Sequence, residues 1–274
     1  MNTIFRSARD NASRALLRLA RRTATDFGWS RMLHDLGAPN MLSGLLALRD
    51  RGVSPRTVVD GGACMGDWTR LFRSVFPDAT VLMIEAQECH AEALRHVCEQ
   101  QAPKVKLAHS LIGPPGLNKA AFVVLDDAAG GTGSSVLPEN SNVPRHVVIL
   151  PVTTLDALVE QQGLSAPDFI KLDVQGFELE VLKGAAAALT VAEFVLLEVS
   201  LWQYNQGSPL LAEVIGWMDQ HGFRAYEIFD ISRRGDGVLV QVDVLFVRKD
   251  SARVADEFTL FPALASGPET YFEA

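Results

Sequence analysis

From residue 57 onward, short apolar runs alternate with segments of helical periodicity, and this alternation restricts the chain to few folds. Strands are expected at 57–62, 79–86, 105–113, 168–174 and 193–200, and helices at 67–75, 88–100, from 155, at 177–189 and at 210–221. Strands that alternate with helices form a mostly parallel sheet with helices on both faces. The runs FRAYEIF (223–229) and GVLVQVDVLFVRK (237–249) have only a loop between them, which predicts a hairpin. We therefore predict a doubly wound, Rossmann-like α/β fold with an antiparallel C-terminal edge strand.

The rest of the chain is arranged around this alternation. Residues 120–152 interrupt it with two expected strands around a loop rich in Gly, Ser and Pro. We divide the 274 residues into an N-terminal helical extension (1–50), one large α/β domain (51–250) and a C-terminal tail (251–274). A domain of that size can bury a sizeable core, and a hydrophobic content of 48% is typical of a globular protein.

Composition limits the compartment and the partners. Cys64, Cys89 and Cys98 are odd in number and lack metal-ligand spacing, which fits a reducing compartment. The sequence contains no run of 18 apolar residues and begins without the apolar region of a secretory signal, so we expect a cytoplasmic protein. The net charge of −8 divides into +5 over residues 1–31 and −13 over the remainder. An acidic body of this kind does not indicate a nucleic-acid partner.

The basic N-terminus has two interpretations. Its apolar residues fall along one helical stripe, with arginines largely off it: Ile4, Phe5, Ala8, Ala12, Ala15, Leu16 and Leu19. A basic amphipathic helix can lie in a membrane interface, which would give peripheral membrane contact through residues 1–25. The alternative is a helix packed on the acidic body. We favour packing, because the stripe is rich in alanine and membrane binding scales with apolar area.

Polar residues and glycines follow three expected strands, where ligands of such folds bind. Asp60, Gly62 and Gly66 form a D-x-G-x-x-x-G loop, and Glu85 ends the next strand, where a carboxylate can accept both hydroxyls of a ribose. The segment HSLIG at the end of the third strand could flank a base. The expected cofactor contacts are Asp60, Gly61, Gly62, Gly66, Glu85, Ala86, Ser110, Leu111 and Asp173.

The glycine loop favours one nucleoside over a dinucleotide. Gly62 is followed by Ala63, Cys64, Met65 and Gly66, so the G-x-G-x-x-G fingerprint of dinucleotide sites is absent. The loop also offers no cationic side chain for a phosphate. These features fit S-adenosylmethionine, a nucleoside with a positively charged tail. The alternative is an ordinary strand–turn–helix corner with no ligand.

The motifs together resemble the FkbM family of S-adenosylmethionine-dependent methyltransferases over roughly residues 55–250. The similar segments are VVDGGACMGDWT, VLMIEA, GSSV (133–136), VTTLDAL (152–158), IKLDVQGFELEVLKGA, VLLEVS and VDVLFV. The resemblance implies a class I methyltransferase fold and O-methylation of a hydroxyl on a polyketide, sugar or glycolipid acceptor. Gln175 departs from the family pattern, since many members have Glu there.

Three charged residues at expected strand ends are the candidate catalytic groups: Asp173, Lys171 and Glu198. Lys171 and Asp173 point to the same face of their strand, so they form either a buried ion pair or part of the reacting site. A carboxylate at the strand end can take the proton of an acceptor hydroxyl. A divalent cation between Asp173 and Glu198 is an alternative that we do not favour, because the sequence shows no histidine pair or third carboxylate at ligand spacing. We therefore assign no metal ligand.

The acceptor site is the least patterned part of the sequence. Trp202 and Tyr204 follow the fifth expected strand and are candidates to stack on a sugar or an apolar acceptor, with packing on the next helix as the alternative. His109 is a candidate contact for adenosine, and Glu178 fits either a favourable interaction with the helix dipole or a catalytic role. Two other functions stay open: N-methylation of an amine, and a non-catalytic cofactor-binding scaffold. The oligomeric state is not defined by the sequence.

Overall fold

The computed structural model describes residues 31, 40–126 and 133–254. The expected basic helix over residues 1–25 and the tail beyond residue 254 lie outside the described residues. In the part of the chain that is described, helices are all too short or too polar to cross a bilayer.

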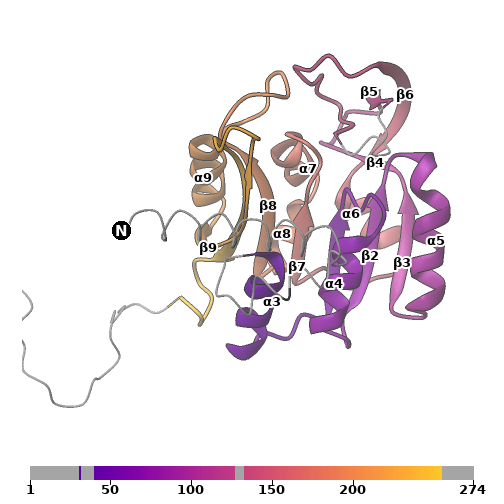
Figure 1. The fold of residues 1–274 in the computed structure, drawn as a ribbon. Coiled ribbons are helices and arrows are strands. Elements are labelled where there is room, and N and C mark those ends of the chain that lie inside the picture. Colours follow the sequence, from indigo (N-terminus) through magenta and orange to yellow (C-terminus); the bar gives the residue numbers. More distant parts are fainter. Residues whose placement is uncertain (1–30, 32–39, 127–132, 255–274) are drawn as a thin grey trace, which may run out of the picture.

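A seven-stranded sheet forms the centre of the molecule, in the order β3-β2-β1-β7-β8-β10-β9 (Figure 1). Its strands are β1 (Thr57–Gly61), β2 (Thr80–Glu85), β3 (Val105–His109), β7 (Phe169–Leu172), β8 (Phe194–Ser200), β9 (Phe223–Arg233) and β10 (Leu239–Arg248). The pairs within β3-β2-β1-β7-β8 are parallel, while β10 pairs antiparallel with both β8 and β9. The predicted mostly parallel sheet with an antiparallel hairpin at its edge is confirmed. Within the hairpin, the C-terminal strand β10 pairs with β8, and β9 is the edge strand of the sheet.

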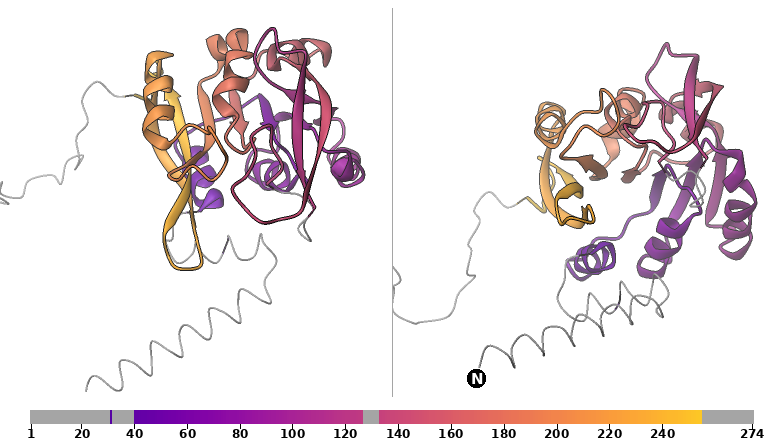
Figure 2. Two further views of the ribbon diagram at one scale, coloured as in Figure 1. Left: turned by 90° about the horizontal axis from the view of Figure 1, so that it is seen from above. Right: turned by 45° about the horizontal axis from the view of Figure 1, so that its top comes forward.

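Helices cover both faces of this sheet (Figure 2). One face carries α3 (Met41–Asp50), α4 (Asp67–Val75) and α5 (Ala91–Gln100), and the other carries α6 (Leu155–Gln161), α7 (Glu178–Lys183), α8 (Ala186–Val191) and α9 (Leu211–Gln220). A short 3-10 helix, η1 (Glu88–His90), precedes α5. The strands alternate their apolar side chains between the two faces, so each helical layer packs on its own core.

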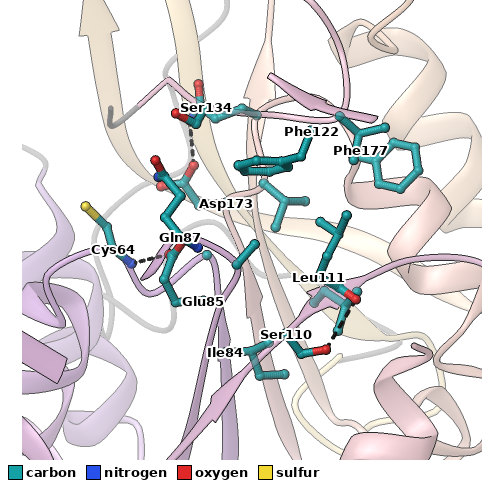
Figure 3. A pocket seen from close by; sticks show the side chains of 16 residues that line it. Cys64, Ile84, Glu85, Gln87, Ser110, Leu111, Phe122, Ser134, Asp173 and Phe177 are labelled. Atoms are coloured by element: carbon teal, nitrogen blue, oxygen red, sulfur yellow. Dashed lines mark hydrogen bonds between the residues drawn. The ribbon is translucent and has the colours of Figure 1, made fainter. Parts of the chain in front are cut away.

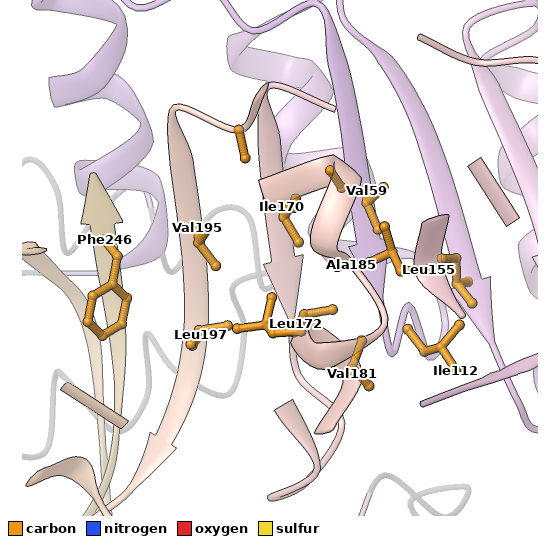
Figure 4. Close-up of a cluster of buried hydrophobic side chains, with 14 of the residues drawn as sticks. Val59, Ile112, Leu155, Ile170, Leu172, Val181, Ala185, Val195, Leu197 and Phe246 are labelled. Atoms are coloured by element: carbon orange, nitrogen blue, oxygen red, sulfur yellow. The ribbon is translucent and has the colours of Figure 1, made fainter. Parts of the chain in front are cut away.

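The core under α6, α7 and α8 shows this packing in detail (Figure 4). Val59, Ile170, Leu172, Val195 and Leu197 project from β1, β7 and β8 and are all buried. They come from neighbouring parallel strands, which explains why these segments read as continuous apolar runs in the sequence. The buried sheet is a rigid base that fixes the positions of the strand ends.

The predicted helix over 177–189 is wrong in one respect, because it is two helices, α7 and α8. A Cβ atom on Gly184 would lie 2.3 Å from the carbonyl oxygen of Gly113, so the chain passes too close to its neighbour to carry a side chain there. The Asp156 carboxylate then accepts from the backbone N–H groups of Ala187 and Ala188, at 2.8 and 2.9 Å. A carboxylate that satisfies free N–H groups starts a new helix.

The predicted strand over 105–113 is also divided, at Ser110. The Ser110 N–H donates to the Glu85 carbonyl at 2.9 Å, after which the chain leaves the main sheet. It continues as β4 (Leu111–Ile112) in a separate three-stranded sheet with β5 (Lys119–Leu125) and β6 (Arg145–Thr153), in the order β4-β6-β5. The two strands expected within 120–152 are β5 and β6. This break places Ser110 and Leu111 at the edge of a cavity.

Candidate active site

A cavity of about 230 Å³ lies at the carboxyl ends of β1, β2 and β3 (Figure 3). Most of the expected cofactor contacts line it, namely Gly62, Glu85, Ala86, Ser110, Leu111 and Asp173. Asp60, Gly61 and Gly66 do not line it. Gln87, Phe122 and Phe177 also line the cavity, and the sequence reading missed all three. Phe122 comes from β5 in the small sheet, so its place in the site depends on tertiary structure that local patterns do not reveal.

Glu85 connects two loops at the edge of this first cavity. Its Oε2 accepts from the Cys64 N–H at 2.8 Å, and its Oε1 accepts from the Gln87 N–H at 2.9 Å. The side chain is only 6% exposed and still lines the cavity. Each carboxylate oxygen can accept more than one hydrogen bond, so Glu85 retains acceptor capacity for a bound hydroxyl.

Asp60 and Lys171 form a buried ion pair below the cavity. Lys171 Nζ lies 3.0 Å from Asp60 Oδ1 and donates to the Gly62 carbonyl at 3.2 Å, while the Thr69 hydroxyl donates to Asp60 Oδ2 at 2.7 Å. Burial opposes the charge on Lys171, but the Asp60 and Asp173 carboxylates hold its pKa above the ordinary value. The structure therefore places Lys171 where it holds the glycine loop, outside the residues that line either cavity of the site.

Gly62 allows the ends of β1 and β7 to meet. Its φ is +74°, and a Cβ atom there would lie 1.9 Å from the Asp173 carbonyl oxygen. The Asp173 N–H also donates to the Gly61 carbonyl at 3.0 Å. Only glycine fits such a close approach in this conformation. Gly62 therefore lets the backbone of the glycine loop approach the backbone at the end of β7.

A second cavity, of about 790 Å³, lies on the other side of Asp173. Its lining includes Glu139, Asn140, Glu198, Trp202, Tyr204 and Gln241. Asp173 and Gln175 line both cavities. Trp202 is 61% exposed, and its Nε1 donates to the Leu239 carbonyl at 3.1 Å, which holds the ring at the cavity wall. The structure therefore brings the expected acceptor residues and the expected catalytic carboxylates to one cavity.

Gln175 links the two carboxylates. Its Nε2 donates to Asp173 Oδ1 at 2.7 Å and to Glu198 Oε2 at 2.8 Å, and its Oε1 accepts from the Tyr204 hydroxyl at 2.9 Å. The sequence reading noted Gln175 only as a departure from the family pattern and gave it no contact. Two of its three partners, Glu198 and Tyr204, lie on β8 and the following loop, so local sequence patterns could not identify them.

Burial raises the pKa of three acidic groups around this network, namely Glu198, Asp243 and Glu178. Burial raises the pKa of Glu198 well above its ordinary value, with further effect from the charges of Asp173 and Asp243. Asp243 lies opposite Glu198 in the β8–β10 register, and burial raises its pKa to about 7. Burial likewise raises the pKa of Glu178 to about 7, although its Oε1 accepts from the N–H groups of Val174 and Gly176. Glu178 thus stabilises the turn after β7, beyond the expected helix-dipole effect.

Two further candidates lie apart from this network. His109 Nε2 is 2.8 Å from Glu88 Oε2, and the ring does not line the first cavity. Within residues 40–126 and 133–254, histidine, cysteine and acidic side chains do not form any group of three placed to hold a metal ion.

A mostly parallel α/β sheet with a nucleoside-sized cavity at its carboxyl end defines a class I methyltransferase fold. A family model for the FkbM methyltransferase domain matches residues 60–225, and the chain belongs to this family. The resemblance seen in the sequence motifs is confirmed.

The chain is similar to several known methyltransferases, which differ from it in length. A stretch of 44 residues is 48% identical to the hexuronic acid methyltransferase AglP of Haloferax volcanii and covers 16% of this chain and 18% of AglP. The methyltransferase FkbM structure from Methylobacillus flagellatus is 18% identical with a TM-score of 0.47, over 86% of this chain and 59% of that one. Magnesium protoporphyrin IX methyltransferase from Synechocystis, solved with bound S-adenosylmethionine, is 13% identical with a TM-score of 0.43 over 76% of each chain. The chain thus spans less than two thirds of the first two proteins.

Proposed function

We propose that the protein is an S-adenosylmethionine-dependent O-methyltransferase that acts on a hydroxyl of a sugar, a glycolipid or a secondary metabolite. The observation that carries this proposal is the meeting of two cavities at Asp173 and Gln175. One cavity is suited to the cofactor and the other to the acceptor. Membership of the FkbM methyltransferase family supports transfer of a methyl group.

The first cavity fits S-adenosylmethionine chemically. Glu85 offers carboxylate oxygens for the ribose hydroxyls, and Ser110, Leu111 and Phe122 surround the space for a base. Among the described residues, the lining of this cavity includes neither Lys nor Arg, which disfavours a phosphate-bearing ligand. The Asp173 carboxylate on the same lining attracts a cation. When bound, S-adenosylmethionine supplies the methyl group as an electrophile and leaves as S-adenosylhomocysteine.

Asp173 is the proton acceptor in this proposal. Its Oδ1 accepts from Gln175, its Oδ2 lies 3.9 Å from Lys171 Nζ, and its side chain is 34% exposed. The acceptor hydroxyl loses its proton to Asp173 as its oxygen forms the new bond to carbon, and the carboxylic acid then returns the proton to solvent. Lys171 and Gly62 fix the backbone from which Asp173 projects. General base catalysis of this kind contributes about 10²–10⁴-fold to rate.

The second cavity favours a polyhydroxylated acceptor. Carboxylate and amide groups of Glu139, Asn140 and Gln241 provide several hydrogen-bonding positions, and the exposed Trp202 ring provides a flat apolar surface. Sugars carry hydroxyls along their edges and C–H groups on their faces, so this combination of side chains suits them. The 44-residue similarity to a hexuronic acid methyltransferase supports a sugar acceptor.

The test combines binding with product analysis. Calorimetry is expected to show binding of S-adenosylhomocysteine, and incubation with methyl-labelled S-adenosylmethionine should label members of a panel of hexosides, hexuronic acids and glycolipids. Mass spectrometry should place one CH₂ unit on a hydroxyl oxygen. Label on an amine would favour N-methylation, and cofactor binding without transfer across a broad panel would favour a scaffold. Binding of NAD without any response to S-adenosylhomocysteine would contradict the proposal.

A further inference from the structure

Gln175 occupies an unusual backbone conformation between the two cavities. Its φ is +55°, in the left-handed region that residues with a side chain rarely adopt, and Gly176 after it has a φ of +92°. Such a conformation is strained for a residue other than glycine, and it persists where the surroundings require that side chain. A second glycine would fit the turn with less strain, so the Gln175 side chain has a role of its own.

The orientation of the Gln175 amide follows from its partners. The amide nitrogen, which only donates hydrogen bonds, faces the Asp173 and Glu198 carboxyl groups at 2.7 and 2.8 Å. The Tyr204 hydroxyl donates to the amide oxygen from the opposite side, and Gln241 Nε2 in turn donates to that hydroxyl. This chain of hydrogen bonds fixes the amide plane. One nitrogen with two hydrogens therefore spans the two carboxyl groups.

We propose that Gln175 is a positioning residue of the methyl-transfer site: its amide nitrogen holds the Asp173 and Glu198 carboxyl groups together, at the position that a divalent cation between them would occupy. This inference rests on the function proposed above. With Oδ1 bonded to the amide and Oδ2 3.9 Å from Lys171 Nζ, the Asp173 carboxyl group has a fixed orientation at the junction of the two cavities. The charged and titratable groups that face this point are Lys171 from β7, Asp243 from β10, Glu178 from α7, and Tyr204.

Two substitutions separate this role from a structural one. Gln175→Glu keeps the shape of the side chain but removes both N–H donors. Gln175→Gly removes the side chain, and glycine readily adopts the left-handed backbone conformation at this position. For the most active acceptor of the panel, both variants should lower kcat by about 10²-fold, the scale of a misplaced reacting group, with little change in KM for S-adenosylmethionine. The third carboxylate of Gln175→Glu should also move the acidic limb of the pH–kcat profile to higher pH by about one unit. Gln161→Glu, on the exposed end of α6, is the matched control and should keep wild-type kcat and profile.

A metal titration tests whether a divalent cation binds at Asp173. Wild-type protein titrated with MnCl₂ in a calorimeter should show no binding that depends on Asp173. Binding of Mn²⁺ that disappears in Asp173→Asn would overturn the inference, as would a folded Gln175→Gly or Gln175→Glu variant with kcat within about threefold of wild type. Melting temperature and S-adenosylhomocysteine affinity establish that each variant is folded. If wild-type protein fails to bind S-adenosylhomocysteine, the proposed function fails first, which distinguishes the two results.

Discussion

Replacement of Lys171 by methionine should destabilise the protein by about 3–5 kcal/mol, the usual cost of leaving one member of a buried ion pair without its partner. Asp60 is fully buried, and Lys171 is 6% exposed, with 3.0 Å between Nζ and Oδ1. The variant keeps the hydrogen bond from the Thr69 hydroxyl, but a neutral donor does not offset the charge of a buried carboxylate. The Gly62 carbonyl also loses the donor that holds it.

A second variant isolates the charge from the loss of packing. Asp60→Asn combined with Lys171→Met removes both charges and keeps similar shapes, so it should recover most of the loss and lie within about 1–2 kcal/mol of wild type. For a protein of this size, the single variant should lower Tm by about 6–20 °C, at about 2–4 °C for each kcal/mol.

Urea unfolding, followed by circular dichroism, provides the measurement. The raised pKa of Lys171 means that its stabilising charge is fully present below the ordinary value of 10.5 and is lost only as pH rises through the raised pKa. The contribution of the Lys171 charge to wild-type stability should therefore be the same at pH 6 and pH 9. A loss below about 1 kcal/mol, or a double variant no more stable than the single one, would refute the assignment of Lys171 to a buried structural pair.

Four further outcomes are expected. Glu85→Ala should weaken S-adenosylhomocysteine binding in calorimetry by about 1–3 kcal/mol, and unchanged affinity would exclude Glu85 from the cofactor site. Asp173→Asn should keep that affinity and lower turnover by about 10²-fold, whereas turnover near wild type would assign Asp173 a structural role. Glu178 has a folded pKa of about 7, above its ordinary 4.5, so the free energy of unfolding should fall as pH rises from 4.5 to 7, by up to about 1.4 kcal/mol per pH unit. Glu178→Gln should flatten this slope in urea unfolding, and an unchanged slope would show that Glu178 does not cause it. Full-length protein should stay in the supernatant with anionic vesicles at low salt, and co-sedimentation that requires residues 1–25 would favour the membrane interpretation.

The sequence predicted the main sheet because each of its strands is a local feature. Apolar runs of five to eight residues between helical segments identify parallel strands wherever they occur. The breaks at Ser110 and Gly184 were missed, since each depends on a contact with a distant segment. After Ser110 the chain leaves the main sheet and β4 pairs with β6, and Gly184 passes against the Gly113 carbonyl. Patterns along the chain do not contain such contacts.

The candidate site divides in the same way. Glu85 and Asp173 were predicted because a residue at the end of a strand needs only the strand to be recognised. Strand periodicity correctly placed Lys171 and Asp173 on one face, but it could not show that the nearest partner of Lys171 is Asp60 on β1. Gln175 was missed because its partners are Asp173, Glu198 and Tyr204, and only the folded chain brings these together.

The place of β7 in the sheet explains why a central strand ends in charged residues. In the strand order, β7 separates β1, β2 and β3, whose ends line the first cavity, from β8 and β10, which contribute to the second. A side chain that must reach both bound molecules comes most directly from the end of β7 or the turn after it, where Asp173 and Gln175 lie. Lys171, two residues earlier on the same face, is buried beneath them and neutralises Asp60. An apolar residue at that position would leave Asp60 without a counter-ion, and an apolar residue two positions later would leave the junction without the Asp173 carboxyl group.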